Sequence, residues 1–335
     1  MKAIVVEKWQ PFENLKLNNI EPPLPKRNEY QIKIKAAGLS FATSLVVQGK
    51  YQVRPPLPFV PGTEIAGEIV FGEDDQNQFF EGQRVCAVID YGGLAEYACA
   101  NVANIFPIPD SLSYEKAVTF TNTYATSLAA ISWKHLLNMQ NKETLLIHGA
   151  TGGVGSAAIE IARAIGLKTI AAVSNTSKVN HAKKIGADHV IINSPSCFKE
   201  KIMELTDNQG VDAVFDPIGG DIFSESIRCL KPEGRISPIG FTSGNIPSIP
   251  ANLILVKNIT ICGLNMGLYF GWGPVDKRKE YRPKMESLMQ QLFDWYCVGK
   301  INPIISETFN LEQAVVAMNA ILQKKTIGRI AIIFE

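Results

Sequence analysis

A glycine-rich run between an apolar segment and an amphipathic one is the strongest chemical signal in the sequence. The run reads Gly-Ala-Thr-Gly-Gly-Val-Gly over residues 149–155. Glycines at the turn let the backbone come close to a pyrophosphate, and a glycine inside the following helix lets that helix pack on the strand. Unpaired N–H groups at the start of such a helix attract the anion. We therefore predict a dinucleotide site formed by Gly149, Gly152, Gly153, Val154 and Gly155.

The end of the next predicted strand bears on the choice of dinucleotide. An enzyme that uses NAD places an acidic residue about 20 residues beyond the last glycine, on the ribose 2′-hydroxyl. This sequence has Ser174, Asn175 and Lys178 there and no acid. Short hydrogen-bonding side chains and a lysine charge suit a 2′-phosphate. The pattern favours NADPH over NADH, with a solvated Lys178 that merely opens the next helix as the alternative interpretation.

The elements that must position these residues follow from the alternation of apolar and amphipathic segments. Compact apolar strands alternate with helical patterns from residue 144 onward, which is typical of a doubly wound parallel sheet in an α/β protein. We predict strands over 144–148, 168–173, 189–192, 211–216 and 235–239, and helices over 152–165, 177–185, 197–206 and 222–230.

The remaining segments predict a second, β-rich part. Short strand-like segments punctuated by Gly and Pro indicate a barrel or sandwich. After Pro109 the spacing becomes helical, with Asp110 or Ser111 as the predicted N-cap, and we place a domain boundary there. Residues 236–256 contain three prolines and predict strand and loop. The predicted strands are 2–7, 31–36, 64–71, 84–89, 95–100, 259–263 and 327–334, and the late helices are 284–298 and 311–323.

Composition limits the classes of protein. The 335 residues correspond to roughly two domains, and 46% hydrophobic with 19% charged residues indicates an ordinary globular protein. A net charge of +1 makes nucleic acid an improbable main partner. The six cysteines are scattered and predict free thiols in a reducing compartment. With neither a secretory segment nor a membrane span in the pattern, we predict a cytoplasmic location.

Ordered blocks along the whole chain resemble a known family. They include AAGLSFATSLVVQGKYQVRPPLPFVPGTEIAGEIV, HGATGGVGSAAIEIARAIG and GVDAVFDPIGGDIFSESIRCLKPEGRISPIGF. The chain resembles medium-chain dehydrogenases/reductases of the zinc-independent quinone oxidoreductase branch, the zeta-crystallin-like group, and is most similar to its quinone oxidoreductase-like members. The resemblance implies a GroES-like β-barrel catalytic domain over 1–121 and 270–335. It also implies a Rossmann domain for NADPH over 122–269 and a homodimer paired through the last sheet strand, near 258–263.

The zinc-dependent alcohol dehydrogenases share that fold, and the sequence differs from them at the metal site. Their catalytic cysteine would fall within residues 37–41, and their ligand histidine would stand at Thr63. Neither ligand is present, and the segment 72–85 lacks the cysteines of their second zinc site. Without a metal to polarise an alcohol, we predict no zinc and the reduction of an electrophilic acceptor, a quinone or an α,β-unsaturated carbonyl compound.

The resemblance also indicates site residues. Ser40 and Thr43 stand where relatives commonly carry Asn and Asp, and Ser40 can hydrogen-bond the nicotinamide ribose or an acceptor oxygen. Tyr51, on a loop leaving the barrel, is the candidate hydroxyl near that oxygen, with an apolar lid as the alternative role. Asn122 and Thr126, at the domain junction, either bind the nicotinamide end or only cap and pack the helix. Further predicted cofactor contacts are Asn193, where some relatives have Tyr, and Gly219, Gly220 and Phe241, with a purely structural role as the alternative for the last three. Arg329 is a predicted contact with the adenosine phosphate, with a surface charge as the alternative.

Other interpretations remain open. His148 and the cysteines receive no chemical role, and the segment 266–282, rich in glycine and aromatic residues, suits a mobile lid. A dinucleotide-binding protein with little turnover would show the same glycine turn. It would serve as a redox sensor, a structural protein or a weak RNA binder. An enoyl-thioester reductase is the third hypothesis, and it requires a basic groove for the acyl carrier.

Overall fold

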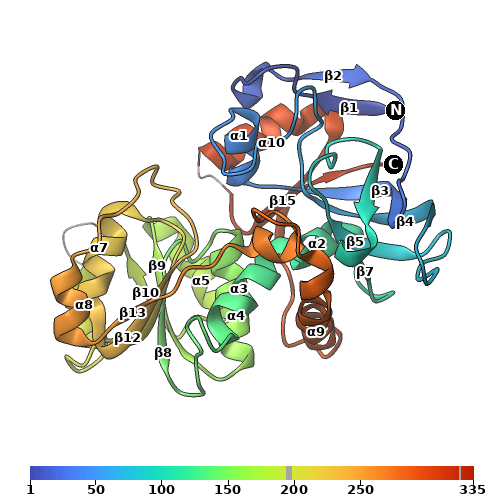
Figure 1. The fold of residues 1–335 in the computed structure, drawn as a ribbon. Helices are drawn as coiled ribbons and strands as arrows, with labels where there is room; N and C mark the ends of the chain where they lie inside the picture. Colours follow the sequence, from blue (N-terminus) through green and yellow to red (C-terminus); the bar gives the residue numbers. More distant parts are fainter. Residues whose placement is uncertain (194–197, 324–325) are drawn as a thin grey trace. The chain divides into compact units, whose positions relative to one another are not determined.

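The chain divides into two compact units, and each unit is built from segments that are separated in the sequence. The computed structural model describes residues 1–193, 198–323 and 326–335 (Figure 1). The first unit comprises residues 1–122, 266–297 and 303–335, and the second comprises residues 123–265 and 298–302. The domain boundaries predicted after residues 121 and 269 stay a prediction.

The first unit is built on a sheet in the order β14-β15-β3-β4-β5-β7, with β6 also paired to β3, and on the separate hairpin β1-β2. All described pairings are antiparallel except that between β14 and β15. The strands are β1 (Lys2–Val5), β2 (Lys16–Asn19), β3 (Glu29–Leu39), β4 (Glu64–Glu73), β5 (Arg84–Val88), β6 (Tyr97–Asn101), β7 (Ile105–Pro107), β14 (Ile305–Asn310) and β15 (Arg329–Ile333). The helices are α1 (Phe41–Val47), α2 (Tyr114–Thr119), α9 (Arg278–Cys297) and α10 (Ala314–Leu322).

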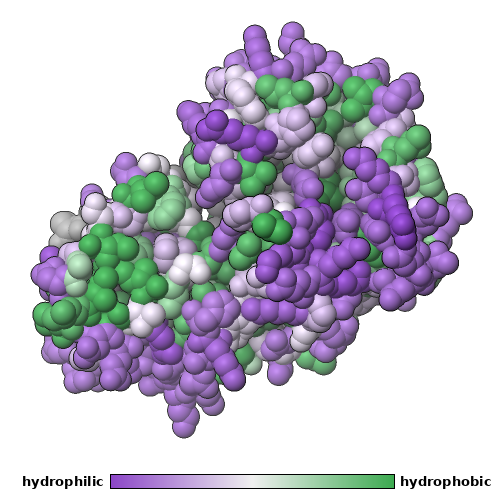
Figure 2. All heavy atoms as spheres, viewed as in Figure 1, coloured by the Kyte–Doolittle hydropathy of each residue, from purple (hydrophilic) through white to green (hydrophobic). Residues whose placement is uncertain are grey.

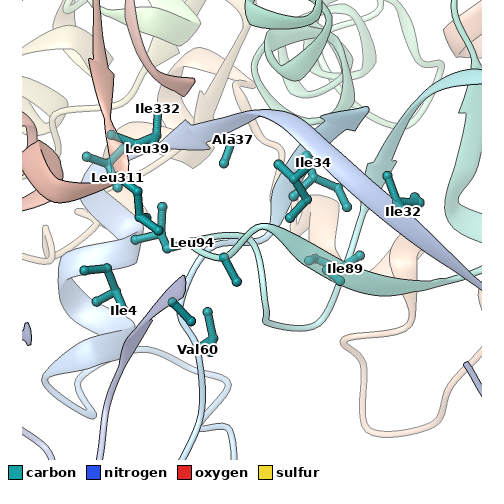
Figure 3. Packing of buried hydrophobic residues seen from close by; sticks show 14 of the residues in the cluster. Ile4, Ile32, Ile34, Ala37, Leu39, Val60, Ile89, Leu94, Leu311 and Ile332 are labelled. Atoms are coloured by element: carbon teal, nitrogen blue, oxygen red, sulfur yellow. The ribbon is translucent and has the colours of Figure 1, made fainter. Parts of the chain in front are cut away.

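Alternation along β3 explains the core of this unit. Ile32 and Ile34 are buried on one face of β3, and they pack with apolar residues from the loops and from the C-terminal strand (Figure 3). Gly67 of β4 permits the close approach of these strands, since a Cβ atom there would lie 2.0 Å from the carbonyl oxygen of Lys33. The labelled members of the cluster include Ile4, Ala37, Leu39, Val60, Ile89, Leu94, Leu311 and Ile332.

The second unit is a parallel sheet in the order β10-β9-β8-β11-β12-β13. Its central strands, β8, β9 and β11, are largely buried, as expected where helices cover a parallel sheet. The strands are β8 (Thr144–Ile147), β9 (Lys168–Val173), β10 (His189–Ile192), β11 (Val211–Asp216), β12 (Leu230–Pro238) and β13 (Thr260–Ile261). The helices are a π-helical turn (Phe120–Tyr124) that leads in from the first unit, then α3 (Ala125–Ser132), α4 (Gly153–Ala164), α5 (Val179–Lys184), α6 (Phe198–Leu205), α7 (Gly220–Cys229) and α8 (Ala251–Lys257).

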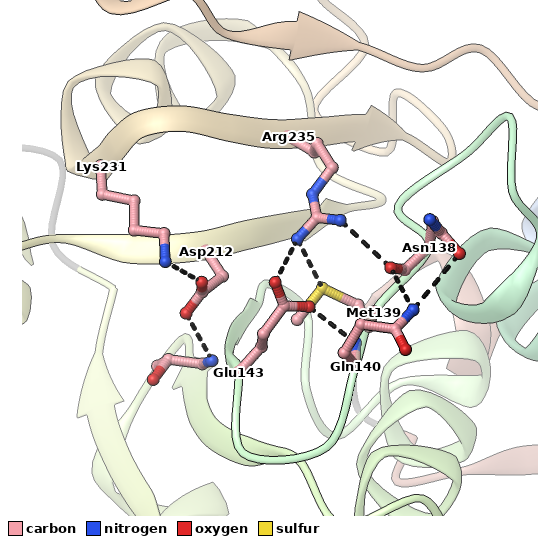
Figure 4. Close-up of polar contacts among 8 residues, drawn as sticks. Asn138, Met139, Gln140, Glu143, Asp212, Lys231 and Arg235 are labelled. Carbon is pink, nitrogen blue, oxygen red and sulfur yellow. Dashed lines mark hydrogen bonds and ion pairs between the residues drawn. The ribbon is translucent and has the colours of Figure 1, made fainter.

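Ion pairs fix the amino ends of the central strands (Figure 4). Arg235 of β12 donates to the Glu143 carboxylate at 2.7 Å, just before β8 begins. Asp212 of β11 pairs with Lys231 of β12 and accepts the backbone N–H of Thr144 at 2.8 Å. These contacts hold the register of β8, β11 and β12 at the amino ends of the strands, and the glycine-rich turn lies at the opposite, carboxyl ends.

Two sequence predictions about helices are wrong. The helix after Pro109 begins at Tyr114, with Ser113 rather than Asp110 or Ser111 at the N-cap. The reason is Arg84, whose guanidinium holds the backbone carbonyls of residues 109, 110 and 112 in a turn. The segment predicted as strand and loop over 236–256 contains all of α8 except its last residue, because its prolines all precede residue 251.

Several elements went unpredicted, and one segment is packed rather than open. The elements α1, β2, β7 and β14 were not expected from the sequence. The segment 266–282, predicted as a lid, starts with a 3-10 helix, Met266–Phe270, in which Met266 and Phe270 are buried. The Asn104 amide donates to the Phe270 carbonyl at 3.0 Å and ties this segment to the rest of the first unit.

Among the described residues, no helix is long and apolar enough to cross a membrane.

Candidate functional site

The glycine-rich turn has the geometry of a phosphate cradle. Gly149 adopts a left-handed conformation with φ of +55°, and the Gly152 N–H donates to its carbonyl at 2.8 Å. A Cβ atom at Gly155 would lie 2.2 Å from the same carbonyl oxygen, so only glycine fits there. Gly152 caps α4 without any side-chain cap, and Gly152, Gly153 and Val154 are half-buried. No side chain caps the first N–H groups of α4, which is the arrangement that an anion site requires, and the binding role of the turn stays a prediction.

The end of β9 provides polar and basic groups beside that turn. The Ala150 N–H donates to the Ala172 carbonyl at 3.2 Å, which places the turn against the last residues of β9. Ser174 and Asn175 follow β9 and are exposed, and Lys178 is half-buried just before α5. Neither Asp nor Glu occurs between 174 and 178. This environment fits a phosphate on the adenosine ribose better than it fits a free 2′-hydroxyl.

The loop after β11 lies at the carboxyl ends of the parallel strands, on the same side as the glycine-rich turn. Asp216 accepts the backbone N–H groups of Ile218 and Gly219, at 2.7 Å and 3.2 Å, and burial raises its pKa to about 6. Gly219 and Gly220 have positive φ angles, +73° and +56°. The ring of Phe241, which follows β12, lies so close that a Cβ atom at Gly219 would be 2.7 Å from it. These predicted cofactor residues therefore lie together.

Asn193 belongs to a buried hydrogen-bonded chain. Its amide donates to Nδ1 of His148 at 3.4 Å, and Nε2 of His148 lies 2.7 Å from Oγ of Ser226. The Ser226 hydroxyl donates to the Ile222 carbonyl at 2.7 Å, so the histidine proton is on Nε2. Burial lowers the pKa of His148 to about 3, and the ring is neutral. The chain braces the carboxyl ends of β8 and β10 against α7, which supports a packing role for His148.

Ser40 and Thr43 lie together at the start of α1. Their hydroxyl oxygens are 3.2 Å apart, and the Ser40 N–H lies 3.4 Å from the Thr43 oxygen. Ser40 is thus the N-cap of a capping box. The predicted catalytic pair therefore caps this helix, and its catalytic role stays a prediction.

Glu64 carries a buried carboxylate that the sequence analysis did not single out, and it interacts with three of the predicted site residues. Glu64, at the start of β4, is 2% exposed. One of its oxygens accepts the Asn122 amide at 2.9 Å, and the other pairs with the Arg329 guanidinium. Burial raises the pKa of Tyr51, and the Glu64 charge raises it further. The contact partner of Arg329 in the structure is thus Glu64, and its predicted contact with an adenosine phosphate stays a prediction.

A small cavity lies beside this carboxylate within the first unit. It is lined by Thr63, Glu64, Val88, Asn122, Met266, Gly267, Phe270 and Trp272. Thr126, the other predicted junction residue, is buried in α3 of the second unit. In the described part of the chain, no group of three or more His, Cys, Asp or Glu side chains is placed to hold a metal ion.

Comparisons with known proteins agree with the two units. The family "Alcohol dehydrogenase GroES-like domain" matches residues 26–110, and "Zinc-binding dehydrogenase" matches residues 153–289. The chain is 34% identical to the quinone oxidoreductase-like protein 2 homolog of Nematostella vectensis over 334 residues, 99% of this chain and 86% of the relative. It is 33% identical to quinone oxidoreductase-like protein 2 of Bos taurus over 94% of this chain and 88% of that protein.

The fold is similar to that of a solved structure. Escherichia coli quinone oxidoreductase, complexed with NADPH, superposes with a TM-score of 0.89 at 24% identity, over 100% of both chains. The predicted fold class, α/β with a GroES-like domain and a Rossmann parallel sheet, is confirmed. The predicted resemblance is confirmed as well: the chain belongs to the medium-chain dehydrogenase/reductase family, among its quinone oxidoreductase-like members.

Proposed function

We propose that this protein is a zinc-independent oxidoreductase that transfers hydride from NADPH to quinones or α,β-unsaturated carbonyl compounds. The observation that carries the proposal is the phosphate cradle at Gly149–Gly155, beside a β9 end that offers Lys178 and lacks an acid. The E. coli relative was solved with NADPH, which supports this cofactor for the present chain. Asn193, Gly219, Gly220 and Phe241 lie at the same sheet edge and are proposed cofactor contacts.

When bound, NADPH supplies the hydride, and the protein positions the acceptor and a proton. Reduction of a quinone to the hydroquinone consumes one hydride from NADPH and one proton from solvent, with NADP⁺ as the other product. Tyr51 remains protonated because burial and the Glu64 charge both raise its pKa. Its hydroxyl is therefore a neutral donor toward the oxygen that becomes negative. Ser40 is the second proposed donor, oriented by its bond to Thr43.

The proposal of zinc independence rests on the residues at the expected metal site. Threonine stands at position 63, where a zinc enzyme has histidine, and no cysteine occurs within 37–41. The adjacent Glu64 carboxylate is already occupied by Asn122 and Arg329. This set provides no soft ligand for zinc. For Asn122 and Thr126 we retain contact with the nicotinamide end as a proposal.

We also propose a homodimer formed at the sheet edge of β13. This short strand ends the sheet order, so one side of it has no partner strand among the described residues. Exposed apolar side chains gather over α8 and the loop before it (Figure 2). Ile246, Leu255 and Val256 are 79%, 77% and 72% exposed. Pairing of β13 with its copy would cover this surface and extend the sheet.

A cytoplasmic location remains our proposal. The described cysteines, Cys86, Cys99, Cys229, Cys262 and Cys297, are all free thiols, which suits a reducing compartment. Cys197 lies outside the described residues.

A second candidate function is NADPH binding with little turnover. It is favoured by the capping box, in which the hydroxyls of Ser40 and Thr43 bond each other at 3.2 Å. Side chains engaged in this way offer a weaker contact to an acceptor than a free amide does. An enoyl-thioester reductase remains the third candidate, although no observation favours it.

Consumption of NADPH and NADH separates these functions. Purified protein in chelator-treated buffer is tested with 1,4-benzoquinone, 9,10-phenanthrenequinone and an aliphatic enone. Oxidation of NADPH that survives chelation supports the proposal. Tight NADPH binding with no turnover on any acceptor contradicts it and supports the binding protein. Activity that depends on added zinc contradicts the metal-free reaction.

A further inference from the structure

Two loops of the second unit lie together after β11 and β12, and we call them the paired loops (residues 217–220 and 239–245). Backbone hydrogen bonds join them. These bonds run from the N–H groups of Thr242 and Ser243 to the carbonyls of Pro217 and Ile218, at 3.1 Å and 3.0 Å. Further along, a Cβ atom at Gly219 would lie 3.0 Å from the Asn245 carbonyl oxygen. The two loops are therefore in contact along their length, and a change in one is passed to the other.

The paired loops also contact the glycine-rich turn. A Cβ atom at Gly149 would lie 3.2 Å from the Pro217 side chain and 3.3 Å from that of Ile218. Three of the proposed cofactor contacts belong to the paired loops, namely Gly219, Gly220 and Phe241. The shape of the paired loops therefore determines how well the proposed site receives a dinucleotide.

Asp216 stands at the point where both loops begin. Its side chain is buried, with 0% of the residue exposed. The carboxylate accepts the N–H groups of Ile218 and Gly219, at 2.7 Å and 3.2 Å, and the Asp216 carbonyl accepts the Ile239 N–H at 2.8 Å. An ionised carboxylate accepts hydrogen bonds on both oxygens, whereas protonation turns one oxygen into a donor. Protonation of Asp216 therefore weakens the contacts that hold the first of the paired loops, and through it the second.

The charged groups on the neighbouring elements leave this carboxylate without an ion pair among the described residues. His148, at the end of β8, is buried, and burial lowers its pKa to about 3, so it is neutral. Asp221, in the first turn of α7, is exposed. Arg235 of β12 lies toward the amino end of that strand and pairs with Glu143. The paired loops contain no ionisable side chain. Burial is therefore the main cause of the raised pKa of Asp216, and backbone N–H groups oppose it.

We propose that the ionised Asp216 carboxylate is a positioning group that keeps the paired loops in the shape that binds NADPH, so that cofactor affinity falls when Asp216 is protonated. This inference rests on the proposed function and adds control by pH to the same cofactor site. Burial raises the pKa of Asp216 to about 6, so the fall occurs just below neutral pH. Asp216 acts through the backbone of the loops and does not itself have to contact the cofactor.

The binding test compares pH profiles of affinity in the wild type and in Asp216→Asn. In the wild type we expect the Kd for NADPH and for NADH to rise about fivefold to tenfold from about pH 7.5 to about pH 5, as Asp216 gains its proton. Asp216→Asn keeps the shape of the side chain and cannot ionise. Its Kd should be raised at pH 7.5 and lack this rise. The 2′-phosphate of NADPH also titrates near pH 6, but NADH lacks that group.

The control for the binding test is Asp221→Asn, which removes an exposed carboxylate from the same helix and should keep the wild-type pH profile. Equal pH profiles in the wild type and in Asp216→Asn would overturn the proposal. Failure of both cofactors to bind at pH 7.5 would refute the proposed function together with this inference. Normal binding with an unchanged pH profile would overturn the inference alone.

Hydrogen exchange of the wild-type protein tests the positioning role without a cofactor or a variant. Mass spectrometry follows the backbone amides of residues 217–222 at about pH 5 and about pH 7.5, with correction for the intrinsic exchange rates. We expect their protection to be about tenfold lower at the acidic pH, because the loops open more often. The amides of β8, Thr144–Ile147, should keep their protection. Unchanged protection over 217–222 would overturn the proposal.

Discussion

Lys178 provides the residue-scale test of cofactor choice. We expect Lys178→Glu to raise the Kd for NADPH about 10-fold to 100-fold, because one charge-assisted contact to the 2′-phosphate is replaced by repulsion. The Kd for NADH should change by about twofold or less. Fluorescence titration measures both constants. Lys183→Glu, an exposed position on α5 with the same change of charge, is the control. Equal weakening of both cofactors would show that Lys178 does not contact the 2′-phosphate.

Asp216 predicts a pH dependence of stability. Its pKa is raised from 3.8 to about 6, so between these values the native state keeps a proton that the unfolded chain has lost. The free energy of unfolding should therefore fall as the pH rises from about 4 to about 6, by about 2 to 3 kcal/mol from this group. Asp216→Asn should flatten that part of the profile in urea titrations. The exposed Asp221→Asn is the control, and an unchanged slope in Asp216→Asn would contradict the assignment.

At the scale of elements, the crossover from β8 to α4 depends on Gly155. We expect Gly155→Ala to lower the free energy of unfolding by about 2 kcal/mol or more, because the added Cβ atom meets the Gly149 carbonyl and the helix must shift. NADPH binding should weaken as well, since the cradle moves with the helix. Lys184→Ala, at an exposed position of α5, is the control for both measurements. A stable variant with normal affinity would show that the crossover tolerates a side chain.

The apolar surface over α8 gives the second prediction for an element. A double variant, Leu255→Glu with Val256→Glu, should convert the proposed dimer to a monomer, because four charges would be buried in a two-fold interface. Light scattering over a series of protein concentrations measures the molar mass. Val316→Glu adds a charge to an exposed apolar position of α10 and should leave the mass unchanged. A wild-type monomer at all concentrations would contradict the proposal.

The elements also show what the sequence could predict. Strands β8 to β12 and the helices between them were predicted because their apolar patterns are local and strong. Helix α8 was not, since three prolines stand before residue 251 and two of its apolar residues, Leu255 and Val256, are exposed. The pairing of Glu64 with Arg329 joins residues 265 positions apart, and no local pattern contains it. Likewise, the capping role of Ser40 and Thr43 follows only from the backbone at the start of α1.

For the whole molecule, NADPH should act as a stabilising ligand of the native state. At a concentration about 100 times its Kd it should raise the free energy of unfolding by about 2.7 kcal/mol, since it binds the folded cradle and not the open chain. Thermal or urea unfolding with and without NADPH measures the shift, and NADH at the same concentration is the comparison. A shift with NADH as large as that with NADPH would contradict the predicted preference.

The divided first unit also has a consequence for biosynthesis. Strand β15 pairs with β3 in its sheet, and the register joins Ile330 to Leu39. The residues of β3 leave the ribosome well before those of β15 are made. The second unit consists of residues 123–265 and the short segment 298–302. It can therefore fold almost completely while the first unit is still incomplete. Until β15 has been made, the part of β3 that it pairs with is open to wrong partners, and the nascent chain should depend on chaperones most strongly in that interval.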